Sequence, residues 1–189
     1  YIQDAALQAE VLKMLKWSHE FNKIYAVNPT PGQNTDFIHV KSNFLIELAL
    51  LGANHDEIAR DLREFSAFLE YAVEISQGAL DGIKPDGTFF NHNSQHISYA
   101  YAYATWITRA FELRGTPFRI TQTAYEKMCF FMKSLFLETS KGAIYPHAAS
   151  GRGPFPSGVP VNVTAFERLI TVGGDLLGSS FEPEMAKFY

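Results

Sequence analysis

The stretch Ile97–Glu138, which reads ISYAYAYATWITRAFELRGTPFRITQTAYEKMCFFMKSLFLE, decides the fold class of this chain. Residues 97–113 and 121–138 each carry apolar side chains at helical spacing. Gly115 and Pro117 mark the short link between them. The first tyrosines, alternating with alanines, look strand-like, but the alanines and the downstream periodicity favour a helix. A long helix, a short link and a second long helix predict an all-α fold built from helical hairpins.

The rest of the chain repeats this pattern. Four further helices are predicted, over residues 5–27, 37–51, 54–73 and 163–177. Asn54, followed three residues later by Glu57, predicts an N-cap with a capping box. No sequence repeat typical of a peptide-binding solenoid is present. Residues 143–160 form a long loop rich in Gly, Pro and Ser, and loops of that length inside a compact domain are usually functional.

Size and composition indicate one globular domain. The chain has 189 residues, 47% of them hydrophobic and 14% aromatic, which suits a sizeable core and excludes a disordered chain. Its apolar runs are far shorter than the roughly 20 residues that a membrane span needs. Its one cysteine, Cys129, lies in an apolar helical stretch, so a buried, inert thiol is expected.

The charge distribution points to two segments. The net charge of −4 would repel an acidic polymer overall, but residues 87–111 and 139–166 contain no Asp or Glu. The cations and histidines of these two acid-free windows are His92, His96, Arg109, Lys141, His147 and Arg152. We therefore expect the functional site to lie there.

Three residues in these windows are the candidate catalytic groups. His92 follows the turn 84–88, Tyr99 comes seven residues later, and Arg152 stands between two glycines. An imidazole titrates near neutrality and can act as a base. A phenol ionises only near pH ~10 and needs a nearby cation such as Arg152 to serve as one. The alternatives are a loop histidine, a packing tyrosine and an exposed turn arginine.

A second set of residues is expected to bind substrate: Asn91, Asn93, His96 and His147. Trp17 and Trp106 could stack on sugar rings, although helical tryptophans are more often core residues. His92 and His96 have a zinc-like i, i+4 spacing, but no glutamate of an HExxH motif lies between them, so no metal site is predicted.

Absent motifs narrow the function further. The chain has no P-loop, Rossmann fingerprint, nucleophile elbow or paired-cysteine site, so no nucleotide or other organic cofactor is expected, and no nucleic acid partner. Paired carboxylates are missing from both candidate loops, which argues against an ordinary glycosidase.

Taken in order, these motifs resemble those of the chondroitin-sulfate ABC lyases. The family's turn is intact as Lys84-Pro85-Asp86-Gly87-Thr88, and Ser150-Gly151-Arg152-Gly153-Pro154-Phe155 falls on its arginine turn. His92 and Tyr99 fall on the family's catalytic histidine and tyrosine. Weaker similarity at Thr35-Asp36-Phe37 and Arg114–Phe118 extends the resemblance over residues 34–160. Residues 93–98 depart from the family pattern.

The resemblance implies a fold and a chemistry. The fold would be an incomplete α/α toroid: residues 1–189 would form a single helical domain, part of a larger catalytic toroid, with the downstream β-sandwich domains absent. The reaction would be β-elimination on a uronic-acid-containing glycosaminoglycan such as chondroitin or dermatan sulfate. Tyr99 would be base and acid, His92 an alternative base or an orienting donor, and Arg152 the stabiliser of negative charge.

The resemblance also implies a setting. The enzyme would be a secreted bacterial protein, periplasmic or extracellular, with an acidic polysaccharide as substrate and C-terminal domains of the parent chain as partners. The family takes a glutamate from a downstream domain, so this chain alone is expected to be weak or inactive. A divalent cation in the full-length enzyme stays open.

Two other classes of function remain. One is another α/α-toroid enzyme, such as an alginate or heparin-type lyase or an uronide hydrolase. The other is a non-catalytic helical module that binds glycans.

Overall fold

The computed structural model confirms an all-α chain. It describes residues 2–25, 34–92, 94–95, 97–139, 144, 146–149, 163–180 and 182–187. Within these ranges the α-helices are α1 (Ala5–Ser18), α2 (Ser42–Leu50), α3 (His55–Ala72), α4 (Tyr101–Leu113), α5 (Gln122–Glu138), α6 (Val163–Leu177) and α7 (Pro183–Ala186). Short 3-10 helices are η1 (Phe21–Tyr25), η3 (Ile97–Ala100) and η4 (His147–Ala149), and η2 (Phe37–Lys41) is a π-helix. Closure into a toroid stays a prediction.

The predicted helices are present, with changes at their ends. The helix predicted over 163–177 has those bounds, and the cap at Asn54 forms, because its Oδ1 accepts a hydrogen bond from the Glu57 backbone N–H at 2.9 Å. The Glu57 carboxylate accepts a hydrogen bond from the backbone N–H of Ala53. In a regular capping box it would accept from the backbone N–H of Asn54. The helix predicted over 5–27 ends at Ser18 and is followed by η1.

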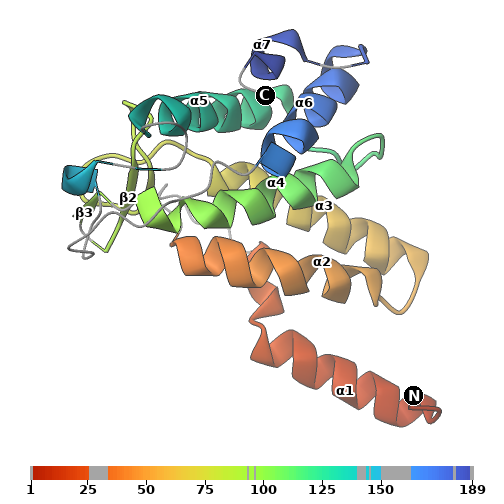
Figure 1. The fold of residues 1–189 in the computed structure, drawn as a ribbon. Helices are drawn as coiled ribbons and strands as arrows, with labels where there is room; N and C mark the ends of the chain where they lie inside the picture. The colour runs from red at the N-terminus through yellow and green to blue at the C-terminus, as the bar shows by residue number, and fades with distance from the viewer. Residues whose placement is uncertain are drawn as a thin grey trace.

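Helix α4 lies at the centre of the molecule. It packs against α2, α6 and η2, with α2 on one side and α5 and α6 on the other (Figure 1). Trp106 is fully buried, and its indole N–H donates to the Leu69 carbonyl of α3 at 2.7 Å. A buried indole needs such a partner. Trp106 is therefore a core residue, and its hydrogen bond fixes α4 on α3.

A small antiparallel sheet stands at one end of the helices, although no strand was predicted there. Its strands are β1 (Gly82–Ile83), β2 (Phe89–Asn91) and β3 (Ser94–Gln95), in the order β1-β2-β3. In the register, Ile83 faces Phe89 and Asn91 faces Ser94. Two- and three-residue strands are too short to show an alternating pattern in sequence.

The sheet is anchored by one aromatic side chain. Phe89 is fully buried, with its ring centroid 5.4 Å from Tyr103 of α4 and 6.2 Å from Phe131 of α5. Burying a phenylalanine contributes roughly 1.5–3 kcal/mol. Phe89 therefore fixes the hairpin to the helical core three residues before the candidate histidine, His92.

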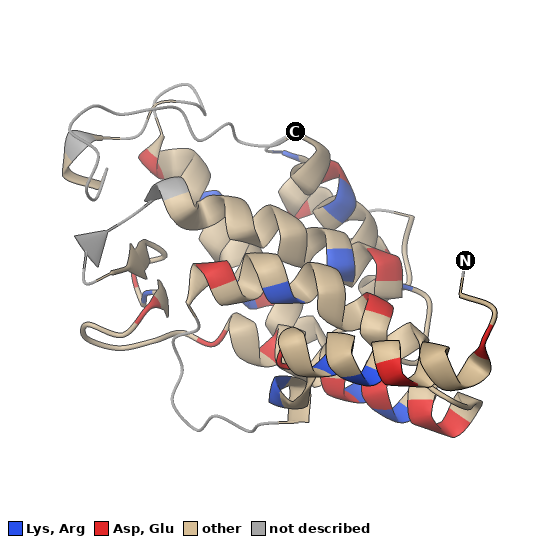
Figure 2. Cartoon of the chain, turned by 90° about the horizontal axis from the view of Figure 1, so that it is seen from below, with Lys and Arg blue, Asp and Glu red and all other residues tan. Residues whose placement is uncertain are grey.

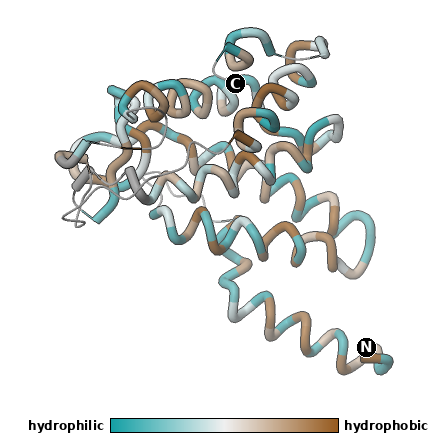
Figure 3. Tube along the Cα trace, in the orientation of Figure 1, coloured by the Kyte–Doolittle hydropathy of each residue, from teal (hydrophilic) through white to brown (hydrophobic). Residues whose placement is uncertain are grey.

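Helix α1 is attached differently from the others. It has no buried residue, although hydrophobic and hydrophilic positions alternate along it in Figure 3. Lys16 joins it to α3 through Glu57 at 3.1 Å and the buried Asp61 at 3.4 Å. Trp17 is 82% exposed, so it is not the core residue that a helical tryptophan usually is.

Charged residues are numerous on the helices around the N-terminal half of the molecule in Figure 2. Among the described residues, no helix combines the length and hydropathy needed to cross a membrane.

Candidate functional site

The turn that precedes the candidate histidine is held by a buried lysine. The Lys84 ammonium donates to the Ser76 hydroxyl and the Gly78 carbonyl, each at 3.0 Å, and also to the Leu80 carbonyl. Burial lowers the pKa of Lys84. A buried cation is tolerated only when several acceptors surround it. Lys84 therefore fixes the loop 76–81 against the hairpin, and its role here is structural.

The tip of the same turn rests on α5. Gly87 has φ +82°, and a Cβ added there would lie 2.0 Å from the Ser134 hydroxyl oxygen. Asp86 Oδ1 accepts from the backbone N–H of Thr88 at 3.0 Å and from its hydroxyl at 2.7 Å, which lowers the pKa of Asp86. Only glycine combines the left-handed backbone with this close approach. The turn therefore sets the position of β2.

His92 comes directly after β2 in a strained conformation. Its φ is +53°, a value uncommon for a residue other than glycine, and its side chain is exposed. Its backbone N–H donates to Asp81 Oδ1 at 3.1 Å, and Asn34 Nδ2 lies 3.5 Å from the other carboxylate oxygen of Asp81. Strain of this kind costs about 1–3 kcal/mol and is concentrated at functional sites. Asp81 therefore helps to fix the backbone of His92.

Tyr99 lies beside His92. The ring centroids are 5.5 Å apart, with an edge-to-face angle of 76°. Tyr99 is half-buried and packs on the core from η3, whereas His92 is exposed. An imidazole and a phenol thus share one surface at the amino-terminal end of α4, an arrangement suited to proton transfer.

Asn91, predicted to bind substrate, is fully buried in β2. Neither its amide oxygen nor its amide nitrogen has a hydrogen-bond partner among the described residues. A buried amide without partners is rare and needs an explanation. Asn91 lies next to His92 in the chain, and substrate binding by its amide stays a prediction.

Several predicted residues fall outside the described part of the chain. These are Asn93, His96 and Arg152, and for His147 the backbone in η4 is described but the side chain is not. Helix η4 lies beside β3 (Figure 1). The second acid-free window therefore reaches the hairpin that carries His92. The contact is made by η4, which ends at Ala149, three positions before Arg152 in the sequence.

Acidic residues from other segments lie beside the candidate pair, although the two sequence windows contain none. Asp81 contacts His92, and the Asp36 carboxylate accepts a hydrogen bond at 3.2 Å from the hydroxyl of Tyr101, two residues after Tyr99. Both acids come from segments outside the two windows. Arg109 of the first window pairs with Glu112 on α4 at 2.9 Å. Sequence windows do not show which distant segments fold against a site.

Further residues at the site were not assigned a role from the sequence. They are Asp36, His39, Asp81 and Tyr101. The available signals were weak: Asp36 lies in the Thr35-Asp36-Phe37 segment, and Asp81 precedes the hairpin. His39 belongs to η2, and a π-helical turn is often found at functional sites.

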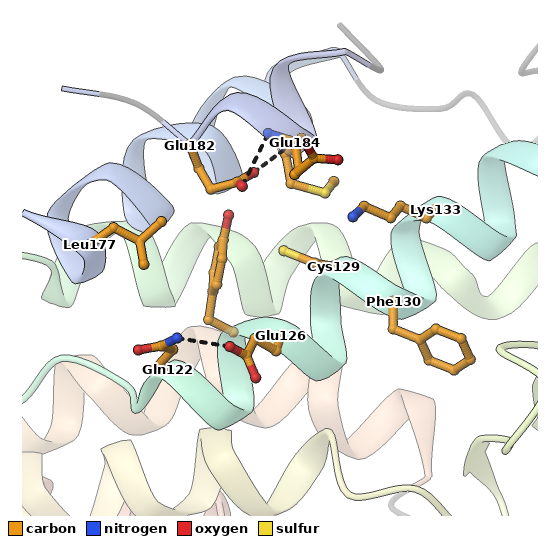
Figure 4. Close-up of a pocket in the computed structure, with 10 residues that line it drawn as sticks. Gln122, Glu126, Cys129, Phe130, Lys133, Leu177, Glu182 and Glu184 are labelled. Carbon is orange, nitrogen blue, oxygen red and sulfur yellow. Dashed lines mark hydrogen bonds between the residues drawn. The ribbon is translucent and has the colours of Figure 1, made fainter. Parts of the chain in front are cut away.

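A pocket of about 320 Å³ lies elsewhere, between α5, α6 and α7 (Figure 4). Three acids, Glu126, Glu182 and Glu184, line it together with Lys133. Cys129 also lines it, and burial raises the pKa of this thiol to about 12, which confirms the inert cysteine. A pocket with this charge balance and a neutral thiol does not suit an acidic substrate.

No metal site emerges from the described residues, which contain no group of three or more His, Cys, Asp or Glu able to hold an ion.

Comparisons with known proteins show the family of this chain. The family model described as "Lyase, catalytic" matches residues 1–189. The chain is 26% identical over 160 residues to the chondroitin sulfate ABC endolyase of Proteus vulgaris, covering 82% of this chain and 16% of that protein. It is 24% identical over 187 residues to the chondroitin sulfate ABC exolyase of Bacteroides thetaiotaomicron, covering 97% of this chain and 18% of that protein. The chain thus spans less than a fifth of the length of these relatives, and it belongs to the family of lyase catalytic domains.

Proposed function

We propose that this chain carries catalytic groups of a polysaccharide lyase that cleaves uronic-acid-containing glycosaminoglycans, such as chondroitin or dermatan sulfate, by β-elimination. The observation that carries the proposal is the His92–Tyr99 pair, with ring centroids 5.5 Å apart at the end of a braced hairpin. The names of the two relatives, both chondroitin sulfate lyases, support this substrate class.

Tyr99 acts as the proton-transfer group in this mechanism. It removes the C5 proton of the uronate, the C4–O bond to the leaving sugar breaks, and a C4=C5 double bond forms. The same phenol then protonates the leaving oxygen. General base catalysis of this kind contributes roughly 10²–10⁴-fold.

His92 and Arg152 act on the charge that builds up during elimination. The exposed imidazole of His92 is either an alternative base or a donor that orients the uronate carboxylate. The Arg152 guanidinium offers a planar fork for that carboxylate and stabilises the enolate-like intermediate. A placed donor of this type contributes about 2.7–4 kcal/mol to the barrier reduction. Asn91, Asn93, His96 and His147 bind substrate around this centre.

The wider setting follows from the same proposal. The chain forms part of a larger catalytic toroid, and domains downstream in the parent chain close the other side of the cleft and supply a glutamate. The isolated chain is then weakly active or inactive. The enzyme is secreted by a bacterium, to the periplasm or beyond. It uses no organic cofactor, and a role for a divalent cation in the full-length enzyme stays open.

The test is the ultraviolet absorbance of the unsaturated uronide that elimination creates. The complete natural chain that contains this sequence is incubated with a panel of chondroitin, dermatan, hyaluronan, heparin and alginate polymers. We expect absorbance to rise with chondroitin or dermatan sulfate. Chain shortening without this chromophore would contradict elimination.

One observation favours a second candidate, a uronide hydrolase. Hydrolysis needs a carboxyl group in the cleft, and Asp81 and Asp36 both lie at the site. Both carboxylates, however, accept hydrogen bonds from protein groups. Release of reducing ends without new absorbance would identify this activity instead.

A further inference from the structure

The pocket between α5, α6 and α7 has the properties of a second binding site. Its volume of about 320 Å³ lies at the lower end of the range of small-molecule sites, roughly 300–1,000 Å³. Phe130 and Leu177, which are 38% and 50% exposed, line it together with the fully buried Met185. The pocket therefore offers apolar contact to a small guest.

One wall of the pocket is fixed by close packing. Tyr125 and Glu182 lie against α6 at Gly173, where an added Cβ would be 2.2 Å from the Tyr125 hydroxyl oxygen and 2.5 Å from the Glu182 Cβ. The Glu182 carboxylate also accepts hydrogen bonds from the backbone N–H groups of Glu184 and Met185, at 3.1 and 2.5 Å. A wall that is already ordered loses little conformational entropy when a ligand binds.

The charges in the pocket favour a cation. Three carboxylates, those of Glu126, Glu182 and Glu184, line it against the ammonium group of Lys133. Glu184 already pairs with Lys187 at 2.5 Å, and this hydrogen bond, together with the charges of Lys187 and Lys133, lowers the pKa of Glu184. The negative charge that is left belongs to Glu126 and Glu182.

Glu126 and Glu182 approach the pocket from two sides. Figure 4 shows Glu126 on α5, Glu182 at the start of α7, and Cys129 between them. The donors to these carboxylates are neutral: the Gln122 amide at 2.8 Å from Glu126, and the α7 N–H groups at Glu182. Burial raises the pKa of the Cys129 thiol, and the charges of Glu182 and Glu126 add to this rise. Both carboxylates therefore act on the same small space.

A further observation points to a hydrogen-bond donor in the pocket. Tyr125 lines it and is 4% exposed, and its hydroxyl has no nitrogen or oxygen partner among the described residues. The Cys129 thiol beside it is a weak hydrogen-bond partner. Buried hydroxyl groups normally have a strong partner. An N–H group that enters the pocket would provide one.

We propose that this pocket binds a small organic cation on an aliphatic stem, an alkylguanidinium or alkylammonium group. The cation donates hydrogen bonds to Glu126 and Glu182, and the stem packs on Phe130 and Leu177. A guanidinium fits better than an ammonium, because its planar fork serves two acceptors and stacks on an aromatic ring. The cation belongs either to a free molecule or to a basic side chain of a protein segment. The proposal does not depend on the lyase function.

The experiment measures binding of butylguanidinium to the complete natural chain by calorimetry at pH 7. Butylurea, a neutral molecule of nearly the same shape, is the matched control ligand. We expect butylguanidinium to bind and butylurea to bind at least about tenfold more weakly, because it carries no charge for the two carboxylates. The melting temperature should rise with the concentration of butylguanidinium, as for any ligand of the folded state.

Two substitutions at the pocket should shift the Kd in opposite directions. Glu126→Gln removes one carboxylate and should weaken butylguanidinium binding about fivefold, the size of one charge interaction in water. Lys133→Gln removes the opposing charge and should strengthen binding by a similar factor. A general loss of folding could not produce both changes. Glu10→Gln on α1, at the other end of the molecule in Figure 1, should change the Kd less than about twofold.

A capped arginine peptide separates the two sources of the cation. Tighter binding of the peptide than of butylguanidinium identifies a protein side chain as the guest, and weaker binding identifies a free molecule. Equal binding of butylguanidinium and butylurea, no binding of any of these cations, or a Kd that neither Glu126→Gln nor Lys133→Gln changes would overturn the cation site.

Discussion

Two regions of this molecule hold a tyrosine near a group that can titrate, and they differ in what surrounds it. At the hairpin, Tyr99 is half-buried beside the exposed His92. In the pocket between α5, α6 and α7, Tyr125 is 4% exposed beside a thiol, Cys129, and burial raises the pKa of both groups. The pocket has the cavity, but the Tyr125 phenol and the Cys129 thiol in it stay neutral. The hairpin presents an exposed imidazole beside a half-buried phenol, which is why we place the candidate site there and not in the pocket.

The two regions also differ in how they are braced. Hydrogen bonds to loop atoms hold the hairpin. Lys84 donates to three acceptors, Asp86 accepts from Thr88, and Asp81 accepts from His92. The pocket is held by packing and by Glu182, whose carboxylate caps α7 through the N–H groups of Glu184 and Met185 at 3.1 and 2.5 Å. Hydrogen bonds of this kind fix the orientation of individual groups, and proton transfer needs groups that are oriented in this way.

Deleting one hydroxyl in each region should give the largest contrast. Tyr99→Phe should reduce elimination by roughly 10²–10⁴-fold, because the proton-transfer group is lost while the ring still packs. Tyr125→Phe removes a buried hydroxyl beside the Cys129 thiol in the other region, so turnover should stay unchanged. Both variants are assayed in the complete natural chain by ultraviolet absorbance and checked for folding by circular dichroism. Equal effects of the two variants would remove the distinction between the regions.

The next effect concerns the glycine on which the hairpin turn rests. Gly87→Ala adds a Cβ 2.0 Å from the Ser134 hydroxyl oxygen at φ +82°. Overpacking should cost about 1–3 kcal/mol, and the left-handed backbone roughly 1–2 kcal/mol more. Gly78 is a matched control, because its φ is +58° and a Cβ there meets nothing within 4 Å. Urea unfolding of both variants separates packing from strain; similar losses would show that the turn does not rest on α5.

The bracing of His92 can be tested through its acceptor. Asp81→Ala leaves the backbone N–H of His92 without its acceptor, Asp81 Oδ1. Water can replace the lost acceptor at this exposed position, so stability should change little, and we expect turnover to fall by up to about a hundredfold because His92 loses its fixed position. Asp81→Asn keeps an acceptor oxygen and should recover most of the rate. If Asp81→Asn were as poor as Asp81→Ala, the carboxylate charge and not the hydrogen bond would matter.

The smallest effect is a pH dependence of stability at the end of α5. Burial, helped by the negative charge of Asp86, raises the pKa of Glu138 from 4.5 to about 7. The folded chain therefore holds this proton more tightly than the unfolded chain. This contribution to stability is full below about pH 4.5 and is lost as the pH rises to about 7.

Glu138→Gln should remove this contribution to the pH dependence of stability. Melting temperatures at pH 5 and pH 8 check this: the wild-type chain should lose a few degrees relative to Glu138→Gln on going to pH 8. Glu126→Gln, on the same helix, serves as the control. A parallel pH response of wild type and Glu138→Gln would mean that the carboxyl group is solvated.

Much of this protein follows from sequence alone. The spacing of apolar residues and the capping residues at helix ends predict the all-α fold class and the positions of the long helices, because both are local properties of the sequence. The bounds of α6 and the cap at Asn54 agree with the structure. The proximity of His92 and Tyr99 was expected from the resemblance to the lyase family, and their ring centroids lie 5.5 Å apart.

Only the tertiary structure decided which distant residues complete the site. Asp81, Asp36 and His39 reach it from outside the acid-free windows, and a charge count along the chain cannot show such contacts. The ring of Phe89 in the short sheet packs between Tyr103 of α4 and Phe131 of α5, contacts that no local sequence pattern shows. Long-range packing overrides local preference wherever a buried aromatic ring stabilises more than the local conformation costs.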